Sequence, residues 1–317
     1  MLERCTLPYM STPINHHHVS QCHSRLFFNE VDKKIYYYDK VLDKFDFKLT
    51  TKSIFSEDYA NTKLENDEFD HKSLEDELNE YFEKDFERHA RNIIELAENP
   101  EKNDESKLES LYYIACYALI ADVRFPENKK NIDNSYDSLM LETARKVRLL
   151  GDEEQASAIE KSIADSKKTK YSNVVHYTKI AASRLSKMGD LDFNIYRINT
   201  TEAFLLPDIG YIQMRDRINN YINPYIQEVA IIGIPLTDKV FVFACSKKLG
   251  DSSSGVTTIN DLNSGIVKDI NGQLFESALK TVATKDESEL KRIVSEQKGS
   301  VQHGHWQQWG LDTHTSA

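Results

Sequence analysis

The sequence has little of what marks extracellular, fibrous or zinc-finger proteins. Its 317 residues include only four cysteines, and these are widely spaced with no C-x-x-C pair. Cysteines this sparse predict reduced thiols and a cytoplasmic location, and they exclude a scaffold built on disulfides. With only 11 glycines and 7 prolines, collagen-like and low-complexity chains are excluded as well.

Long apolar runs and an excess of basic residues are also missing. The longest apolar run, residues 111–121, is shorter than the roughly 18 residues of a membrane span, and the first ten residues lack the apolar segment of a secretion signal. We therefore expect no membrane association. Lys and Arg number 40 against 51 Asp and Glu, a net charge of −11. This charge disfavours nonspecific nucleic-acid binding without excluding a local basic patch.

No standard catalytic or nucleotide-binding motif is present. The sequence contains no G-x-G-x-x-G, no P-loop, no H-E-x-x-H and no G-x-S-x-G. Its elements also do not alternate strictly as strand, helix, strand, which argues against a dinucleotide-binding fold.

The patterns that are present predict an α+β fold. Residues 31–39 are rich in β-branched and aromatic side chains and predict a strand, with a hairpin partner at 45–47. From about 73 to 189, apolar residues recur at helical spacing and predict a block of helices. After Gly189, alternating and apolar runs predict an antiparallel β block, capped by two helices at roughly 260–283 and 285–297.

These elements predict one domain. A hydrophobic content of 40% is sufficient for a packed core. We expect a single large domain at 1–297, with its helical part at about 65–189 and its β part at about 190–297. The remaining tail, 298–317, shows no periodicity and is expected to be mobile.

Histidines are concentrated near the N-terminus. His16, His17, His18 and His23 lie close together, with Cys22 among them. Imidazole and thiolate groups ligate transition metals, and an imidazole also serves as a general base. Alternate residues of an extended segment face the same side, so His16 could share a centre with His18, and His17 with His23. The alternative is a loop anchored by stacked and hydrogen-bonded imidazoles.

Three further side chains are candidates for catalysis, metal ligation or substrate binding. Asp208 follows a proline after an apolar run, which suits metal ligation or catalysis, although aspartate also bonds its own turn at such positions. Glu83 lies one helical turn from Glu87, where a carboxylate pair binds a cation or transfers protons, or forms part of a solvated face. Arg124, at a predicted helix end, either clamps a phosphate or carboxylate or caps its helix.

The histidine-rich segment resembles the opening signature of the DUF4238 family, which reads roughly H-H-Y-V-P-Q-F-Y-L-R-N-F. Residues 16–27 read HHHVSQCHSRLF, with Ser20 in place of the usual proline. Later family elements have similar counterparts in the same order: KIYYYD at 34–39, RFP at 124–126, AFLLPD at 203–208, IPLT at 234–237 and IN at 270–271. The family has no assigned activity, but members occur among bacterial defence genes, so the resemblance implies a role there.

Two functions follow from these observations. The first is a metal-assisted hydrolase, of a nuclease type, in bacterial defence. Its divalent-metal ligands would be His16, His17, His23 and Asp208. His17, Asp208 and Glu83 would be catalytic, and Arg124 would hold the phosphate of a nucleic-acid substrate. The second is a non-catalytic sensor or interaction protein, whose negative charge favours a basic protein partner. The first requires the histidines and Asp208 to line one hollow.

Overall fold

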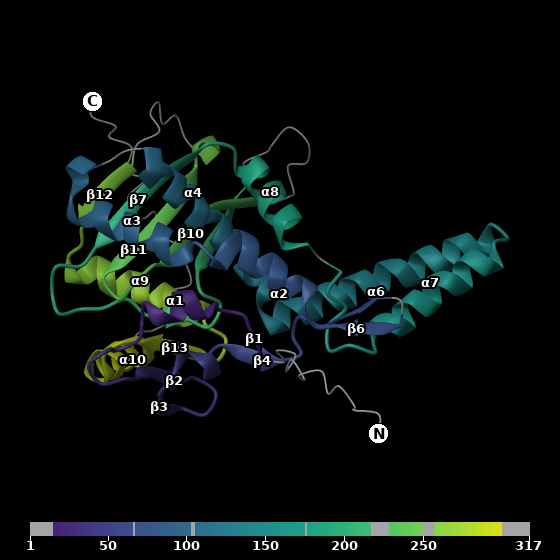
Figure 1. Cartoon of the computed structure of the whole chain (residues 1–317), viewed down its shortest axis with the longest axis horizontal. Coiled ribbons are helices and arrows are strands. Elements are labelled where there is room, and N and C mark those ends of the chain that lie inside the picture. The colour runs from purple at the N-terminus through teal and green to yellow at the C-terminus, as the bar shows by residue number, and fades with distance from the viewer. Residues whose placement is uncertain are drawn as a thin grey trace, which may run out of the picture.

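A computed structural model describes residues 15–65, 67–102, 105–174, 176–216, 228–249 and 257–299. Within these ranges the chain has the predicted α+β fold, shown in Figure 1. The predicted tail lies outside the described residues from residue 300 onward. No helix among the described residues combines the length and the apolar character needed to cross a bilayer.

The first strands of the chain form a sheet that the end of the chain completes. Strands β2 (Ile35–Asp39) and β3 (Lys44–Lys48) form the predicted hairpin. Strand β13 (Thr281–Thr284) pairs with the other side of β2, and β8 (Leu206–Pro207) follows, which gives the order β3-β2-β13-β8. The prediction of a helix up to residue 283 is therefore wrong at its end. The backbone of this short segment pairs with two distant strands, and its apolar Val282 is fully buried there.

The histidine-rich segment begins as a strand and continues as a short helix. Strand β1 (Asn15–His17) pairs antiparallel with β4 (Ser56–Asp58), and helix α1 (Gln21–Arg25) follows. A second small pair, β5 (Lys63–Glu65) with β6 (Glu68–Asp70), leads into the helical block.

The helical block follows β6, at the position that the sequence predicts. Its α-helices are α2 (Ser73–Leu78), α3 (Phe86–Glu98), α4 (Glu105–Leu119), α5 (Ala121–Arg124), α6 (Pro126–Leu149), α7 (Glu153–Ser166) and α8 (Tyr177–Met188). Between α2 and α3, residues Asn79–Glu83 form a π-helical turn, in which the N–H of Lys84 donates to the carbonyl of Asn79 over 2.9 Å. π-Helical turns are rare in proteins, and those that occur are often found at functional sites.

Helices α6 and α7 form a hairpin that extends away from the four-stranded and five-stranded sheets (Figure 1). Asp152 caps α7, because its carboxylate accepts the N–H of Gln155 over 2.9 Å. The outer part of the hairpin is apolar in places. Leu139 is 64% exposed, and Leu149 and Leu150 at the turn are 87% and 86% exposed.

The second half of the chain builds a five-stranded sheet. Its strands are β7 (Leu191–Arg197), β9 (Ile212–Asp216), β10 (Glu228–Pro235), β11 (Val240–Ser246) and β12 (Thr257–Asp261), in the order β12-β7-β11-β10-β9. Strands β10 and β11 pair as an antiparallel hairpin, in agreement with the predicted antiparallel block. Strand β12 differs from the expectation, because it adds to the free edge of β7 in parallel orientation.

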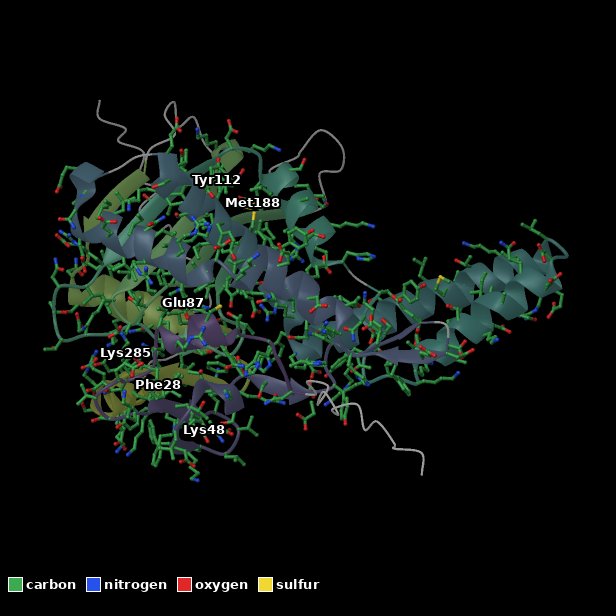
Figure 2. The ribbon with its side chains drawn as sticks, in the orientation of Figure 1. Phe28, Lys48, Glu87, Tyr112, Met188 and Lys285 are labelled. Atoms are coloured by element: carbon green, nitrogen blue, oxygen red, sulfur yellow. The ribbon has the colours of Figure 1, made fainter. Side chains whose placement is uncertain are left out.

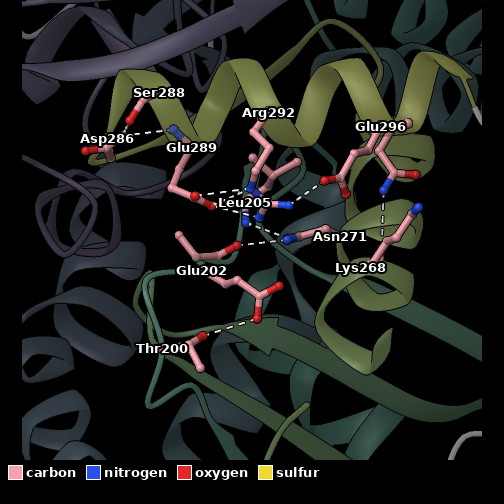
Figure 3. A network of polar contacts seen from close by, with 12 residues as sticks. Thr200, Glu202, Leu205, Lys268, Asn271, Asp286, Ser288, Glu289, Arg292 and Glu296 are labelled. Atoms are coloured by element: carbon pink, nitrogen blue, oxygen red, sulfur yellow. Dashed lines mark hydrogen bonds and ion pairs between the residues drawn. The ribbon is translucent and has the colours of Figure 1, made fainter. Parts of the chain in front are cut away.

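Two helices cap the β block. They are α9 (Ser264–Ser277) and α10 (Glu287–Gly299), and Figure 3 shows polar contacts of both. The buried amide of Asn271, on α9, accepts the N–H of Leu205 over 3.0 Å and donates to the carbonyl of Ala203 over 2.8 Å. This clamp fixes the segment that leads into β8.

The apolar core forms three clusters. The largest lies between the helical block and the five-stranded sheet, where Figure 2 labels Tyr112 and Met188. A smaller cluster contains Val19 and Phe27 from the first segment together with Leu206 from β8, and the labelled Phe28 packs against it. The N-terminal segment therefore packs against the second half of the chain.

Candidate functional site

Strand β1 directs neighbouring histidines to opposite sides. His16 points inward and is 1% exposed, and its Nδ1 accepts the N–H of Asn61 over 2.6 Å. His16 thus holds the loop before β5 against the first strand. This is the anchoring role that the sequence leaves open for these imidazoles.

His17 is partly exposed, and its ring is fixed by one backbone contact. Its Nε2 lies 3.2 Å from the carbonyl oxygen of Lys52. Since a carbonyl only accepts, Nε2 carries the proton and Nδ1 presents its lone pair. Among the described residues, Nδ1 of His17 has no hydrogen-bond partner. Burial, followed by the positive charge of Arg124, lowers the pKa of His17 below its ordinary value of 6.5. The imidazole is therefore neutral at pH 7, and its Nδ1 can accept a proton.

Arg124 ends α5 and is 3% exposed. Its Nη2 donates to the backbone carbonyl of His17 over 2.8 Å and to Oε1 of Glu83 over 2.7 Å. Burial by itself would lower the pKa of Arg124, but the negative charge of Glu83 outweighs this effect and raises the pKa above its ordinary value. Its Nε and Nη1 are buried, and neither has a partner among the described residues. Buried donors of this kind are uncommon in folded proteins.

Glu83 is the last residue of the π-helical turn, and its side chain is 24% exposed. The sequence predicts Glu83 and Glu87 as a pair on one helical face. In the structure Glu83 pairs with Arg124, whereas Glu87 (Figure 2) forms a 2.6 Å ion pair with Arg25 of α1. We call His17, Glu83 and Arg124 the His17 site.

A set of buried polar side chains lies under the His17 site, and the sequence analysis missed it. The ammonium of Lys129, on α6, donates to the carbonyl of Ala60 over 2.7 Å, to Oδ1 of Asn173 over 2.8 Å and to Oδ1 of Asn61. The hydroxyl of Tyr177 also donates to Asn61, over 3.2 Å. Burial, followed by the charge of Arg124, lowers the pKa of Lys129 to about 7. No periodicity distinguishes such residues from a solvated helix face.

His23 lies on α1 and is fully buried. Its Nε2 donates to the carbonyl of Pro235, at the end of β10, over 2.7 Å, and its ring packs against Phe86 and Tyr117. Burial lowers the pKa of His23 to about 4. His23 therefore joins the first helix to the five-stranded sheet as a neutral ring.

Asp208 follows β8 and is 2% exposed. Its carboxylate accepts the backbone N–H groups of Leu279, Lys280 and Thr281 over 3.0, 2.7 and 3.0 Å. Burial raises its pKa despite these bonds. Asp208 thus holds the turn before β13. Of the N-terminal imidazoles, it is His18 that lines the same cavity as Asp208.

The predicted metal ligands do not meet in one place. No group of three or more His, Cys, Asp or Glu side chains is arranged to hold a metal ion in the part of the chain that the structure describes. All four predicted ligands already bond other groups: His16 bonds Asn61, His17 bonds Lys52 through Nε2, His23 bonds Pro235, and Asp208 bonds the distant turn at residues 279–281. The donor set therefore does not fit a divalent ion. His17, Glu83 and Arg124, by contrast, are brought together.

The comparisons with known proteins identify a family. The family described as "Protein of unknown function (DUF4238)" has a model that matches residues 15–288 of the 317-residue chain. Comparisons with curated proteins and with solved structures return no match. The matched range starts in β1, contains the whole His17 site and ends inside α10. This chain therefore belongs to the DUF4238 family of proteins of unknown function.

Proposed function

We propose that this protein is a hydrolase that cleaves phosphate esters, with nucleic acid as its substrate. The observation that carries the proposal is the shared contact of Arg124, whose Nη2 holds both the His17 backbone and the Glu83 carboxylate. It places the backbone of His17 against a buried guanidinium that has two further donors, and the charge of this guanidinium acts on the neutral His17 imidazole. A base next to a fixed positive charge is what attack by water on a phosphate requires.

His17 is the general base of the proposed reaction. Its Nδ1 takes a proton from water as the water oxygen forms a bond to phosphorus. The bond from phosphorus to the leaving oxygen breaks, and the imidazolium returns the proton to that oxygen. Burial and Arg124 lower the pKa of His17, and the negative charges of Glu83 and Glu75 partly offset this lowering. The two carboxylates therefore help to stabilise the imidazolium while it exists.

Arg124 holds the phosphate. Its guanidinium supplies a fixed positive charge and two donors without a partner among the described residues, and the charge that develops on the phosphate oxygens strengthens this interaction. Glu83 keeps the guanidinium charged and oriented. The described side chains do not form a site for a metal ion. The proposed reaction uses His17, Glu83 and Arg124 alone.

The experiment is a hydrolysis assay on bis(4-nitrophenyl) phosphate and on short single strands of RNA and DNA. His17→Gln should lower kcat by about 10² to 10⁴, the usual contribution of a general base. The matched control is His176→Gln, at an exposed histidine that precedes α8. A wild-type protein that hydrolyses none of these substrates, or equal rates for His17→Gln and the wild type, would refute the proposal.

A cytoplasmic role in bacterial defence is part of the proposal. Cys22, Cys116 and Cys245 are free thiols, which is the usual state of cysteine in the cytosol. The defence role rests on the genes among which family members occur, and an assay of phage survival with the His17→Gln variant tests it.

The second candidate function is that of a non-catalytic interaction protein. The projecting α6–α7 hairpin supports it, because Leu149 and Leu150 at the turn are exposed. The net charge of −11 favours a basic protein as the partner. For this function, Leu149→Ser with Leu150→Ser should abolish biological activity, while His17→Gln should leave it intact.

A further inference from the structure

A cavity of about 270 Å³ adjoins the His17 site. His18 and Phe125 line it, and they are the chain neighbours of His17 and Arg124. The volume lies just under the range of roughly 300 to 1,000 Å³ that is typical of small-molecule sites. The cavity therefore suits one compact group rather than a long ligand.

Aromatic rings form part of the wall. The His18 ring lies edge-on to Phe125 and to Phe55, with ring centroids 5.3 and 6.1 Å apart. Tyr37 of β2 also lines the cavity. Flat apolar walls of this kind hold a planar ring, because stacking on an aromatic side chain contributes about 1 to 3 kcal/mol for each nucleic-acid base.

His18 provides a polar group in this apolar wall. Its Nδ1 is buried and has no hydrogen-bond partner among the described residues. Burial lowers the pKa of His18 to about 3, so the ring is neutral at pH 7. A neutral imidazole offers one donor and one acceptor. The unpartnered Nδ1 can therefore bond one polar atom on the edge of a heterocyclic base, which carries donors and acceptors.

Two lysines complete the cavity. Lys48, labelled in Figure 2, comes from β3, and Lys280 comes from the turn before β13. Neither ammonium has an ion-pair partner among the described residues, although Lys48 lies 5.8 Å from the centroid of the Tyr37 ring. The charge of Lys280 acts on His18, so this ammonium is close to the aromatic wall. Together the lysines supply two positive charges for one anion.

Three carboxylates also line the cavity, and two of them are already compensated. Asp208 accepts three backbone N–H groups. Glu57 forms a 2.6 Å ion pair with Lys170 and accepts the hydroxyl of Tyr171 over 2.9 Å. Only Glu127 remains without a partner among the described residues. Among the described residues, the two lysines therefore face one carboxylate, Glu127, that has neither an ion-pair partner nor a hydrogen-bond donor.

We infer that this cavity binds one nucleotide unit of the substrate strand, with the base against Phe55, Phe125 and His18 and a phosphate at Lys48 and Lys280. The inference deepens the proposed function and rests on it for the nature of the substrate. The adjacent His17 site would then act on the next phosphate along the strand. The class of ligand is a nucleoside monophosphate.

Isothermal titration calorimetry with uridine 5′-monophosphate tests the inference without turnover. We expect binding of the monophosphate, and binding of uridine or of inorganic phosphate that is at least about tenfold weaker. Lys48→Ala and Lys280→Ala should each raise the Kd for the monophosphate by about tenfold or more. The control is Lys44→Ala, because Lys44 lies on the same strand but pairs with Asp46 at 2.7 Å; this variant should bind as the wild type does.

His18→Phe keeps a ring in the wall and removes its nitrogens, so it should weaken binding of the monophosphate while the thermal unfolding temperature stays the same. If this variant does not fold, the lysine variants decide the question. No binding of the monophosphate, or equal Kd values for the wild type and both lysine variants, would overturn the inference. His17→Gln should bind normally and fail to hydrolyse. Lysine-dependent binding without any hydrolysis by the wild type would refute the proposed function and leave the cavity assignment standing.

Discussion

The backbone carbonyl of His17 lies 2.8 Å from Nη2 of Arg124, and the same nitrogen lies 2.7 Å from Oε1 of Glu83. One buried nitrogen thus joins the first strand, the end of α5 and the π-helical turn. Because the contact to His17 uses the backbone, it fixes the strand and leaves the imidazole free for chemistry.

The pH dependence of hydrolysis should follow the imidazole of His17. Burial and the charge of Arg124 lower its pKa from the ordinary 6.5. A general base is active when unprotonated, so kcat/KM should rise with pH, reach half its maximum below pH 6.5 and be constant at neutral pH. Initial rates on bis(4-nitrophenyl) phosphate between pH 4.5 and 9 measure this profile. A rate that still climbs above pH 8 would show that another group is the base.

Glu83→Gln should destabilise the protein, because it removes the charge that compensates the buried Arg124. We expect a loss of about 1 to 3 kcal/mol in the free energy of unfolding, less than for a fully buried pair since Glu83 is 24% exposed. Urea denaturation measures it. Glu80→Gln is the control, since Glu80 is exposed and its pair with Lys84 is a surface pair. Equal stability of the two variants would contradict the prediction.

Asp208→Asn should reduce stability and spare catalysis. An amide has only one oxygen, whereas the carboxylate accepts three backbone N–H groups, so at least one buried donor loses its partner. Each lost partner costs about 1 to 3 kcal/mol. Calorimetric unfolding measures the loss, and kcat of the folded variant should stay within about twofold of wild type. A large fall in kcat without a change in stability would restore the catalytic role that the sequence predicts for Asp208.

His23 should make the fold sensitive to acid. Burial lowers its pKa from 6.5 to about 4 in the folded chain. Between these two pH values the unfolded chain binds the proton and the folded chain does not, so stability falls as pH falls from 6.5 towards 4. The loss reaches about 3 kcal/mol. Urea denaturation at pH 7, 5.5 and 4.5 measures it, and His23→Gln should flatten this slope; an unchanged slope would contradict the assignment.

Local patterns were sufficient to predict much of the fold. The β-branched and aromatic content of residues 31–39 predicts β2, and the helical spacing after residue 73 predicts the block from α2 to α8, because composition and amphipathic periodicity are local properties. Strand β13 was missed because its pairing partner, β2, lies far away in the sequence. Four residues cannot show a period, so only the distant partner determines that they form a strand.

The candidate site was predictable in its residue types and not in its contacts. His17, Glu83 and Arg124 stand out in the sequence as a histidine in a cluster, an acid on a helix and an arginine at a helix end. The partners of His23 and Asp208 are backbone groups of Pro235 and of residues 279–281, which carry no sequence signal. The burial of Lys129 was equally hidden, since α6 is mostly polar around it.

The pairing of β13 with β2 also has a consequence for biosynthesis. While the chain is being made on the ribosome, one edge of the β2–β3 hairpin stays unpaired until residues 281–284 have emerged. The turn at residues 279–281, which Asp208 holds and which carries Lys280, is also made only at this stage. A prematurely terminated translation product that stops before residue 281 would therefore lack one wall of the cavity beside His18, so such fragments could not acquire the complete binding surface.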